Sequence, residues 1–271
     1  MLPVLFKLGP ITIHTYGFLF ATGVLMAILL TLHLSKKRGL DTKVVADFVF
    51  ITILIGLLGA KIFLFVTEIR HYLKYPAEIK YLLTSGGTFY GGLIFGAVFA
   101  VWYIRKHKLD YRILGDIAAP SIALAHFFGR MGCFAAGCCH GRAAGDSLFG
   151  VSYSSSYAHQ HTGVPLNVSV YPTQLVEATL NLLNFIILFT LYKFKKNRFD
   201  GQIFIIYIFN YSIIRFFVEF FRGDHDRGYI FGGMDHPFTS LSAPQLISII
   251  GLIISIILYF VFKRKGEQQN S

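Results

Sequence analysis

The sequence predicts an all-α, polytopic membrane protein, and three observations support this fold class. Of the 271 residues, 54% are hydrophobic and only 14% are charged, whereas a soluble domain has about 25% charged residues. The apolar residues form long runs, and most basic residues lie at the ends of these runs. Despite a net charge of +11, this pattern excludes a disordered chain, a nucleic-acid-binding protein and an ordinary soluble enzyme. The bilayer is therefore the expected solvent.

Seven apolar stretches are candidates for membrane-spanning helices, which need about 20 residues each. They cover residues 17–35, 44–66, 89–103, 114–134, 173–192, 201–221 and 243–262. We expect the first stretch to be a retained helix and not a removable signal peptide, because no small-residue cleavage site follows it. The chain shows no internal repeat, so a single membrane domain over residues 1–271 is the simplest interpretation.

The loops between these spans alternate in charge. The loops after spans one, three, five and seven contain 15 Lys and Arg residues, and the other loops contain 7. The positive-inside rule therefore predicts an N-terminus outside the cell and a cytoplasmic C-terminus. The predicted outer loops, residues 67–88, 135–172 and 222–242, are also the long ones. Function usually resides in such loops, so we expect it at the outer face.

Three basic residues remain inside the predicted spans, namely Lys61, Arg130 and Arg215. A cation near the bilayer centre costs about 2.5–3.5 kcal/mol, so such residues usually pair or bind a ligand. The spans also contain Glu177 and Glu219, and Glu219 follows Arg215 by four residues on one helix face. One interpretation is a buried structural ion pair. The other is a phosphate site, because the cations outnumber these glutamates and guanidinium suits phosphate.

Two glycine-rich segments, residues 86–96 and 129–142, accompany these charges. Small residues allow membrane helices to approach closely, which explains many of these glycines. Backbone N–H groups at Gly-rich helix ends can also hold an anion. Neither segment has the spacing of a nucleotide P-loop.

All three cysteines, Cys133, Cys138 and Cys139, fall within seven residues beside His140. Their spacing matches no common zinc pattern, so we expect no metal. Packing of small, soft side chains is the favoured interpretation. A disulfide from Cys133 to one of the other two is an alternative if the chain turns there.

Several motifs follow one another along the chain in a recognisable order. They are H-T-Y-G at residues 14–17, the two glycine-rich segments, Y-P-T-Q-L-V-E at residues 171–177, R-x-x-x-E-F-F-R-G-D at residues 215–224 and L-S-A-P-Q-L at residues 241–246. Over residues 9–262 the chain thereby resembles the bacterial phosphatidylglycerol–prolipoprotein diacylglyceryl transferases.

The resemblance implies an enzyme of the bacterial inner membrane. Such an enzyme moves the diacylglyceryl group of phosphatidylglycerol to the thiol of a lipobox cysteine, and glycerol phosphate leaves. The implied partners are phosphatidylglycerol, prolipoprotein signal peptides and the lipid bilayer, with no nucleic acid and no cofactor. The resemblance also places the active site toward the outer leaflet.

The resemblance also implies site residues. Arg130, Arg215 and Tyr16 match essential positions of the family, and with Tyr90 they form the predicted catalytic set. The predicted headgroup-binding set comprises Arg130, Arg215, Arg222, Tyr211, Glu219, Gly91, Gly92, Gly141, Cys133, Cys138 and Lys61. Two guanidinium groups in a low dielectric can stabilise the charge that grows on the departing phosphate.

The chain departs from the family pattern where the proton of the thiol is handled. Tyr90 replaces the histidine of F-H-G-G, Cys133 and Cys138 replace an asparagine and a glutamate, and Lys61 replaces an arginine. Neutral tyrosine, with a pKa of about 10, is a poor base. The alternative bases are His14, His126 and His140. The field of the arginines is a further means of lowering the thiol pKa.

Two other functions stay open. A divergent paralogue would use the same arginines on an anionic phospholipid with a different acceptor, or would use its own cysteines. The departures at Tyr90, Cys133 and Cys138 motivate this alternative. A non-enzymatic transporter of small anions is suggested only by the intramembrane cations. It is disfavoured by the missing repeat symmetry and by unusual residues that gather near the outer face.

Overall fold

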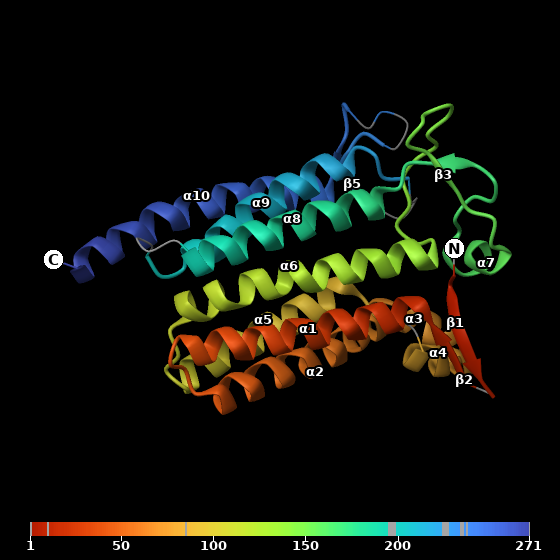
Figure 1. The fold of residues 1–271 in the computed structure, drawn as a ribbon. Helices are drawn as coiled ribbons and strands as arrows, with labels where there is room; N and C mark the ends of the chain where they lie inside the picture. Colours follow the sequence, from red (N-terminus) through yellow and green to blue (C-terminus); the bar gives the residue numbers. More distant parts are fainter. Residues whose placement is uncertain are drawn as a thin grey trace. The chain divides into compact units, whose positions relative to one another are not determined.

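The computed structural model describes residues 2–9, 11–84, 86–194, 199–223, 228–233, 236 and 238–270. These residues are mostly helical, which confirms the predicted all-α class (Figure 1). Within them, six helices are long and apolar enough to span a membrane: α1 Thr15–Lys37, α2 Thr42–Thr67, α6 Tyr111–Ala136, α8 Thr173–Phe194, α9 Gln202–Glu219 and α10 Ala243–Asn270, the last over Ala243–Arg264. Their outward faces expose large apolar side chains, as lipid contact requires. The chain is a multi-pass membrane protein.

The span predicted at residues 89–103 corresponds to α5, Phe89–Lys106, which is not among these six helices. Helix α5 has 18 residues and ends on Arg105 and Lys106, and these two side chains lower its mean hydropathy. The count of seven spans and the orientation of the chain therefore remain predictions.

The contacts divide the chain into two compact units. The larger unit is Met1–Thr31 with Gly115–Ser271, and the smaller is Leu32–Leu114. In the smaller unit, the short helices α3 Ile69–Lys74, η1 Pro76–Glu78 and α4 Ile79–Thr84 lie between α2 and α5 in the chain.

Helices α2 and α5 of the smaller unit pack closely because glycines line their contact. A Cβ atom on Gly91 would overlap the carbonyl oxygen of Gly59, and one on Gly59 would overlap the ring of Phe95. A Cβ atom on Gly92 would lie 3.1 Å from the carbonyl oxygen of Gly56. Close helix packing therefore accounts for Gly91 and Gly92. Their predicted contact with a lipid headgroup stays a prediction.

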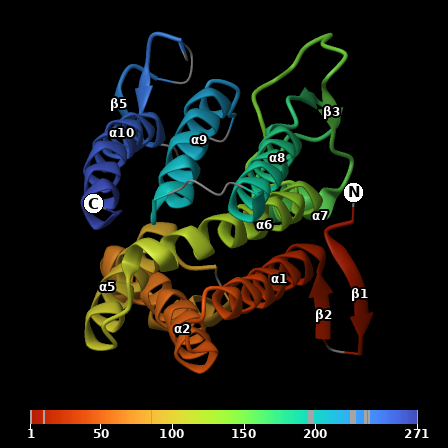
Figure 2. The ribbon, with the colours of Figure 1, turned by 60° about the vertical axis from the view of Figure 1, so that its left-hand side comes forward.

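In the larger unit, the small elements gather at the end of the helices opposite the C-terminus (Figure 1). Among the described residues they form three antiparallel pairs of strands and one short helix. The pairs are β1 Val4–Leu8 with β2 Ile11–His14, β3 Val151–Ser152 with β4 Ser169–Val170, and β5 Tyr229–Phe231 with β6 Leu241–Ser242, and the helix is α7 Ser156–Thr162. Helix α9 lies between α8 and α10 and packs against both (Figure 2).

A buried carboxylate from α6 fixes the start of α9. Asp116 Oδ2 accepts a hydrogen bond from the N–H of Gly201 at 3.0 Å, and Oδ1 accepts from Ile203 and Phe204 at 2.8 and 3.1 Å. These are backbone donors that a helix start leaves unpaired, and the carboxylate also faces the positive end of the helix dipole. Asp116 lies within the predicted span 114–134. The predicted spans therefore contain this further acid besides Glu177 and Glu219.

Replacing Asp116 with Ala should destabilise the larger unit by about 2 kcal/mol or more, because buried N–H groups lose their acceptor. Thermal unfolding of the detergent-solubilised protein measures this loss. The matched control is Ser121→Ala, which removes a buried hydroxyl whose one hydrogen bond among the described residues is to the Ile117 carbonyl of its own helix. This control should unfold near the wild-type temperature. Equal unfolding temperatures for D116A and the wild type would contradict the capping role.

Candidate functional site

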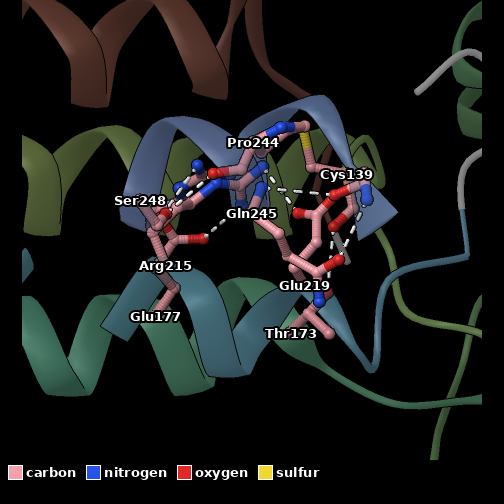
Figure 3. Close-up of polar contacts among 10 residues, drawn as sticks. Cys139, Thr173, Glu177, Arg215, Glu219, Pro244, Gln245 and Ser248 are labelled. Carbon is pink, nitrogen blue, oxygen red and sulfur yellow. Dashed lines mark hydrogen bonds and ion pairs between the residues drawn. The ribbon is translucent and has the colours of Figure 1, made fainter. Parts of the chain in front are cut away.

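Four charged side chains from three helices meet near one end of the larger unit. Arg130 lies nearly two turns before the end of α6, Glu177 in the second turn of α8, and Arg215 and Glu219 in the last turns of α9. Arg130 Nη2 is 2.9 Å from Glu177 Oε1, and Arg215 Nη1 is 3.6 Å from Glu177 Oε2. Arg215 Nη2 is 2.9 Å from Glu219 Oε2 (Figure 3). We refer to these four residues as the ion network.

The ion network is buried and balanced in charge. The side chains of Glu177 and Glu219 are 0% and 3% exposed, and those of Arg130 and Arg215 are each 15% exposed. A lone charge at such burial is costly unless it is paired, and here two cations face two carboxylates. The predicted Arg215–Glu219 pair is present, but Glu177 joins it to Arg130. The two guanidinium groups therefore face one shared carboxylate.

The guanidinium groups retain N–H donors for a ligand. An arginine side chain has five such donors in a planar fork. Arg215 Nη1, at 3.6 Å from Glu177 Oε2, makes no hydrogen bond within the described residues. The side chains of Arg130 and Arg215 are each 15% exposed, although Arg215 Nη1 itself is buried. Phosphate suits this fork geometry.

Polar and aromatic side chains surround the ion network. Tyr211, one turn before Arg215, stacks on Tyr207 and on His126, with ring centroids 5.9 and 4.9 Å away. Tyr211 also interacts with the guanidinium of Arg130. These contacts place Tyr211 where its hydroxyl can add a hydrogen bond to a ligand held by the arginines.

The start of α10 is tied to the end of α9 through the same network. The hydroxyl of Ser242 donates to Glu219 Oε1 at 2.9 Å. The backbone N–H of Ser242 donates to Gln245 Oε1 at 3.0 Å, and the N–H of Gln245 donates back to the Ser242 hydroxyl at 3.3 Å. This reciprocal pair is a capping box in form. It holds the hydroxyl that orients the Glu219 carboxylate.

Three loop segments join beside the ion network through backbone hydrogen bonds. The N–H of Gly141 donates to Tyr171 at 2.9 Å, and the N–H of Arg142 donates to Phe221 at 2.9 Å. A Cβ atom on Gly141 would overlap both of these carbonyl oxygens. Glycine is therefore required at position 141 by the close approach of two backbones.

Arg222 lies in this loop junction. Its backbone pairs with Gly141, and the residue is only 7% exposed. Asp224, the last residue of the R-x-x-x-E-F-F-R-G-D motif, lies outside the described residues. The structure thus places Arg222 beside Gly141, both of which belong to the predicted headgroup-binding set.

The three cysteines come together at the end of α6. All are free thiols, and their sulfur atoms lie within 4.8 Å of one another. Cys133 is in the last turn of α6, and Gly137, with φ +83°, ends the helix. Cys139 has φ +60°, which is unusual for a residue with a side chain. These two left-handed positions turn the chain back so that Cys138 and Cys139 approach Cys133.

The first turn of α8 holds this cysteine turn in place. The hydroxyl of Thr173 donates to the carbonyl of Cys139 at 3.0 Å (Figure 3). Gln174 Nε2 donates to the carbonyl of Cys138 at 2.8 Å and to the hydroxyl of Tyr153 at 3.0 Å. Burial raises the pKa of Tyr153 to about 12, so its phenol stays protonated at neutral pH.

Neighbouring thiols and two guanidinium groups influence the charge of Cys139. Hydrogen bonds with the Cys133 and Cys138 thiols lower the pKa of Cys139, and the guanidinium groups of Arg222 and Arg130 lower it further. Tyr16, in the first turn of α1, packs against α6, where a Cβ atom on Gly132 would lie 3.1 Å from its ring. Tyr16 is therefore held next to the turn that carries the cysteines.

The structure divides the predicted site residues between the two units. The larger unit brings one group to the end with the long loops: Tyr16, Arg130, Cys133, Cys138, Gly141, Tyr211, Arg215, Glu219 and Arg222. Tyr90, Gly91, Gly92 and Lys61 belong to the smaller unit. There Tyr90 is 46% exposed on α5, and Lys61 Nζ donates to the carbonyl of Leu82 at 2.7 Å.

The three candidate bases occupy different surroundings. The ring of His14 stacks on Tyr157 with centroids 6.0 Å apart. The buried His140 has Nδ1 2.9 Å from the carbonyl oxygen of Gly141. His126 packs on Tyr211, and its Nδ1 makes no hydrogen bond within the described part of the chain. His126 therefore lies beside Tyr211 with Nδ1 left for a proton, and His140 lies next to Gly141, another residue of the predicted site.

Several residues at the centre of this geometry were absent from the predicted site set. Glu177, Gln174 and Gln245 are each fully or almost fully buried. All three lie in motifs that the sequence analysis quotes, so the sequence did contain an indication of their importance. Glutamate or glutamine in an apolar helix is costly without a partner, so such residues mark buried polar networks.

Fold and site together define a multi-pass membrane protein with a buried Arg–Glu network at one helix end. A family model described as prolipoprotein diacylglyceryl transferase matches residues 3–261, and the chain belongs to this family. It is 35% identical over 262 residues to the phosphatidylglycerol–prolipoprotein diacylglyceryl transferase of Clostridium tetani (strain Massachusetts / E88), which covers 97% of each chain. It is 34% identical over 267 residues to such a transferase, numbered 2, of Clostridium perfringens (strain 13 / Type A), which covers 98% of each chain. The predicted family is confirmed.

A double-mutant cycle tests the central contact of the ion network. Arg130→Gln and Glu177→Gln should each destabilise the protein, and the double variant should lose less than the sum. The coupling free energy should be about 0.5–3 kcal/mol, because each single change leaves a buried charge uncompensated. Denaturation of the four proteins in detergent measures this coupling. Additive losses would show that the two side chains do not interact.

Proposed function

We propose that this chain transfers the diacylglyceryl group of phosphatidylglycerol to the cysteine thiol of a prolipoprotein, the first step of lipoprotein maturation. A C–S bond forms and the C–O bond to phosphate breaks. Glycerol phosphate leaves with the electron pair of that bond, and the thiol loses its proton. The family match over residues 3–261 and the names of the relatives support this reaction.

The observation that carries the proposal is the pair of guanidinium groups on either side of Glu177. The shared carboxylate fixes Arg130 and Arg215 against each other, so their remaining donors are already oriented. Charge grows on the phosphate oxygens as the C–O bond breaks, and preorganised donors in a low dielectric stabilise such charge strongly. Arg130 and Arg215 therefore act as a phosphate clamp.

The other predicted residues support this clamp. Tyr211 adds a hydroxyl beside Arg130, and Glu219 holds Arg215 in place. Arg222 and Gly141 shape the loop junction next to the clamp. Tyr16 lies beside the turn that carries Cys133 and Cys138, and we assign it a hydrogen bond to the substrate. Tyr90, Gly91, Gly92 and Lys61 belong to the smaller unit, and their part in the reaction stays a prediction from the resemblance.

We place the protein in the bacterial inner membrane with its active site toward the outer leaflet. The excess of Lys and Arg in the loops after the odd-numbered predicted spans supports this orientation. In the larger unit, the ion network lies at the end that carries the long loops, opposite the C-terminus. A cytoplasmic C-terminus therefore agrees with a site near the outer face.

Replacing Arg130 or Arg215 with Ala should lower the rate of transfer by about 100- to 1,000-fold, because each variant loses donors to the developing charge. The measurement is the mass of a lipobox peptide after incubation with the protein and phosphatidylglycerol vesicles. The matched control is Arg112→Ala, since Arg112 forms a comparable ion pair with Asp110 at 2.8 Å in the smaller unit. Full activity of R130A or R215A would refute the clamp.

A divergent transferase with another acceptor is the second candidate, and the three adjacent thiols favour it. In that case the arginines would still hold an anionic phospholipid. The same assay distinguishes the two functions. A lipobox peptide that gains no mass, while phospholipid is consumed, would support the second candidate and exclude the first.

A further inference from the structure

We infer that Cys133, Cys138 and Cys139 form a binding site for a thiophilic divalent metal ion of the zinc class, with one coordination position left open. Their spacing in the chain matches no common zinc pattern, because such patterns consist of paired ligands. The fold nevertheless brings all three sulfur atoms within 4.8 Å of one another. The proposal rests on this spatial cluster.

The distances fit a metal after a small adjustment. A zinc ion has Zn–S bonds of about 2.3 Å in a tetrahedral arrangement, which requires S···S separations of about 3.8 Å. Sulfur atoms at most 4.8 Å apart need to move by about 1 Å at most. Rotation of the cysteine side chains supplies such movement without a change in the backbone.

The backbone around the thiols is held in place. The carbonyl groups of Cys138 and Cys139 accept hydrogen bonds from Gln174 and Thr173. Cys139 keeps a left-handed φ of +60°, which costs a residue with a side chain about 1 kcal/mol or more. Simple packing of small side chains does not require this strained and anchored turn. A preorganised set of metal ligands requires such a turn, because the thiols must be held close together.

The charge of the surroundings also fits. Three thiolates and a divalent ion carry a net charge of −1, which needs a positive environment when partly buried. The guanidinium groups of Arg130 and Arg222 act electrostatically on the cysteine turn. They therefore compensate the negative charge of the metal-bound form.

Three protein ligands leave a tetrahedral ion with one exchangeable position, as in catalytic zinc sites. On the proposed function, a thiol substrate arrives at this end of the molecule. The open position suits that substrate thiol, because a metal-bound thiol loses its proton and stays available as a thiolate. This last step rests on the proposed function, whereas the metal site does not.

Cobalt(II) is the probe for the site. We expect the tag-free, detergent-solubilised protein to bind about one Co²⁺ ion per chain and to show thiolate-to-cobalt charge-transfer absorption, which Zn²⁺ then displaces. The chain contains three cysteines in total, so any such absorption comes from this cluster. Each of Cys133→Ser, Cys138→Ser and Cys139→Ser should weaken Co²⁺ binding by about tenfold or more.

A matched control is His159→Gln, which removes an imidazole from α7 that is bonded to the carbonyl of Val164. It should leave the charge-transfer absorption unchanged. A wild-type protein that binds Co²⁺ without charge-transfer absorption would overturn the proposal. A disulfide among the three cysteines, detected as a loss of two hydrogen atoms in the intact mass, would also overturn it.

A lipobox peptide tests the open position. Its cysteine form should shift the charge-transfer absorption of the Co²⁺-loaded protein, and the same peptide with serine should not. If diacylglyceryl transfer proceeds but no shift occurs, the assignment of the open position is wrong. If Co²⁺ binds and the peptide shifts the absorption but no transfer is detected, the metal site stands and the proposed function fails.

Discussion

The buried carboxylate of Glu177 is the constraint on which the site depends. It has no exposed surface and contacts a guanidinium from α6 and another from α9. Without it, two cations would face each other in a low-dielectric environment, where like charges repel strongly. With it, three helices are held at fixed distances near one end. The contact with Glu177 stabilises two buried arginines and also orients both guanidinium groups toward the same carboxylate.

The first two turns of α8 join the cysteine turn to the ion network. Thr173 and Gln174 hold the cysteine turn, and Glu177 holds the arginines. These residues stand within five consecutive positions of the Y-P-T-Q-L-V-E motif. Because they lie on two successive turns of one rigid helix, the thiols and the guanidinium groups keep a fixed relation to each other. These contacts explain why several polar residues stand together at the start of this apolar helix.

Composition and charge patterning were sufficient to predict the fold class, because lipid imposes long apolar helices on any chain that crosses it. The motifs were sufficient to predict the family and the proximity of Arg130 and Arg215. Patterning did not reveal that Glu177 lies between the arginines, since a salt bridge between helices leaves no trace in sequence spacing. The approach of the thiols was only an alternative that required a turn, because it depends on left-handed residues at positions 137 and 139. Asp116 was overlooked because its partners lie 85 or more residues away.

The cap on α9 bears on the order in which the protein is made. Asp116 precedes the first residue that it caps by 85 positions, and a nascent chain emerges from its N-terminus. Helix α6, which carries Asp116, is therefore synthesised before α9. The amide groups at the start of α9 thus find their acceptor on a helix that is synthesised earlier. A chain read in the opposite direction would insert α9 first, with no such acceptor to receive it.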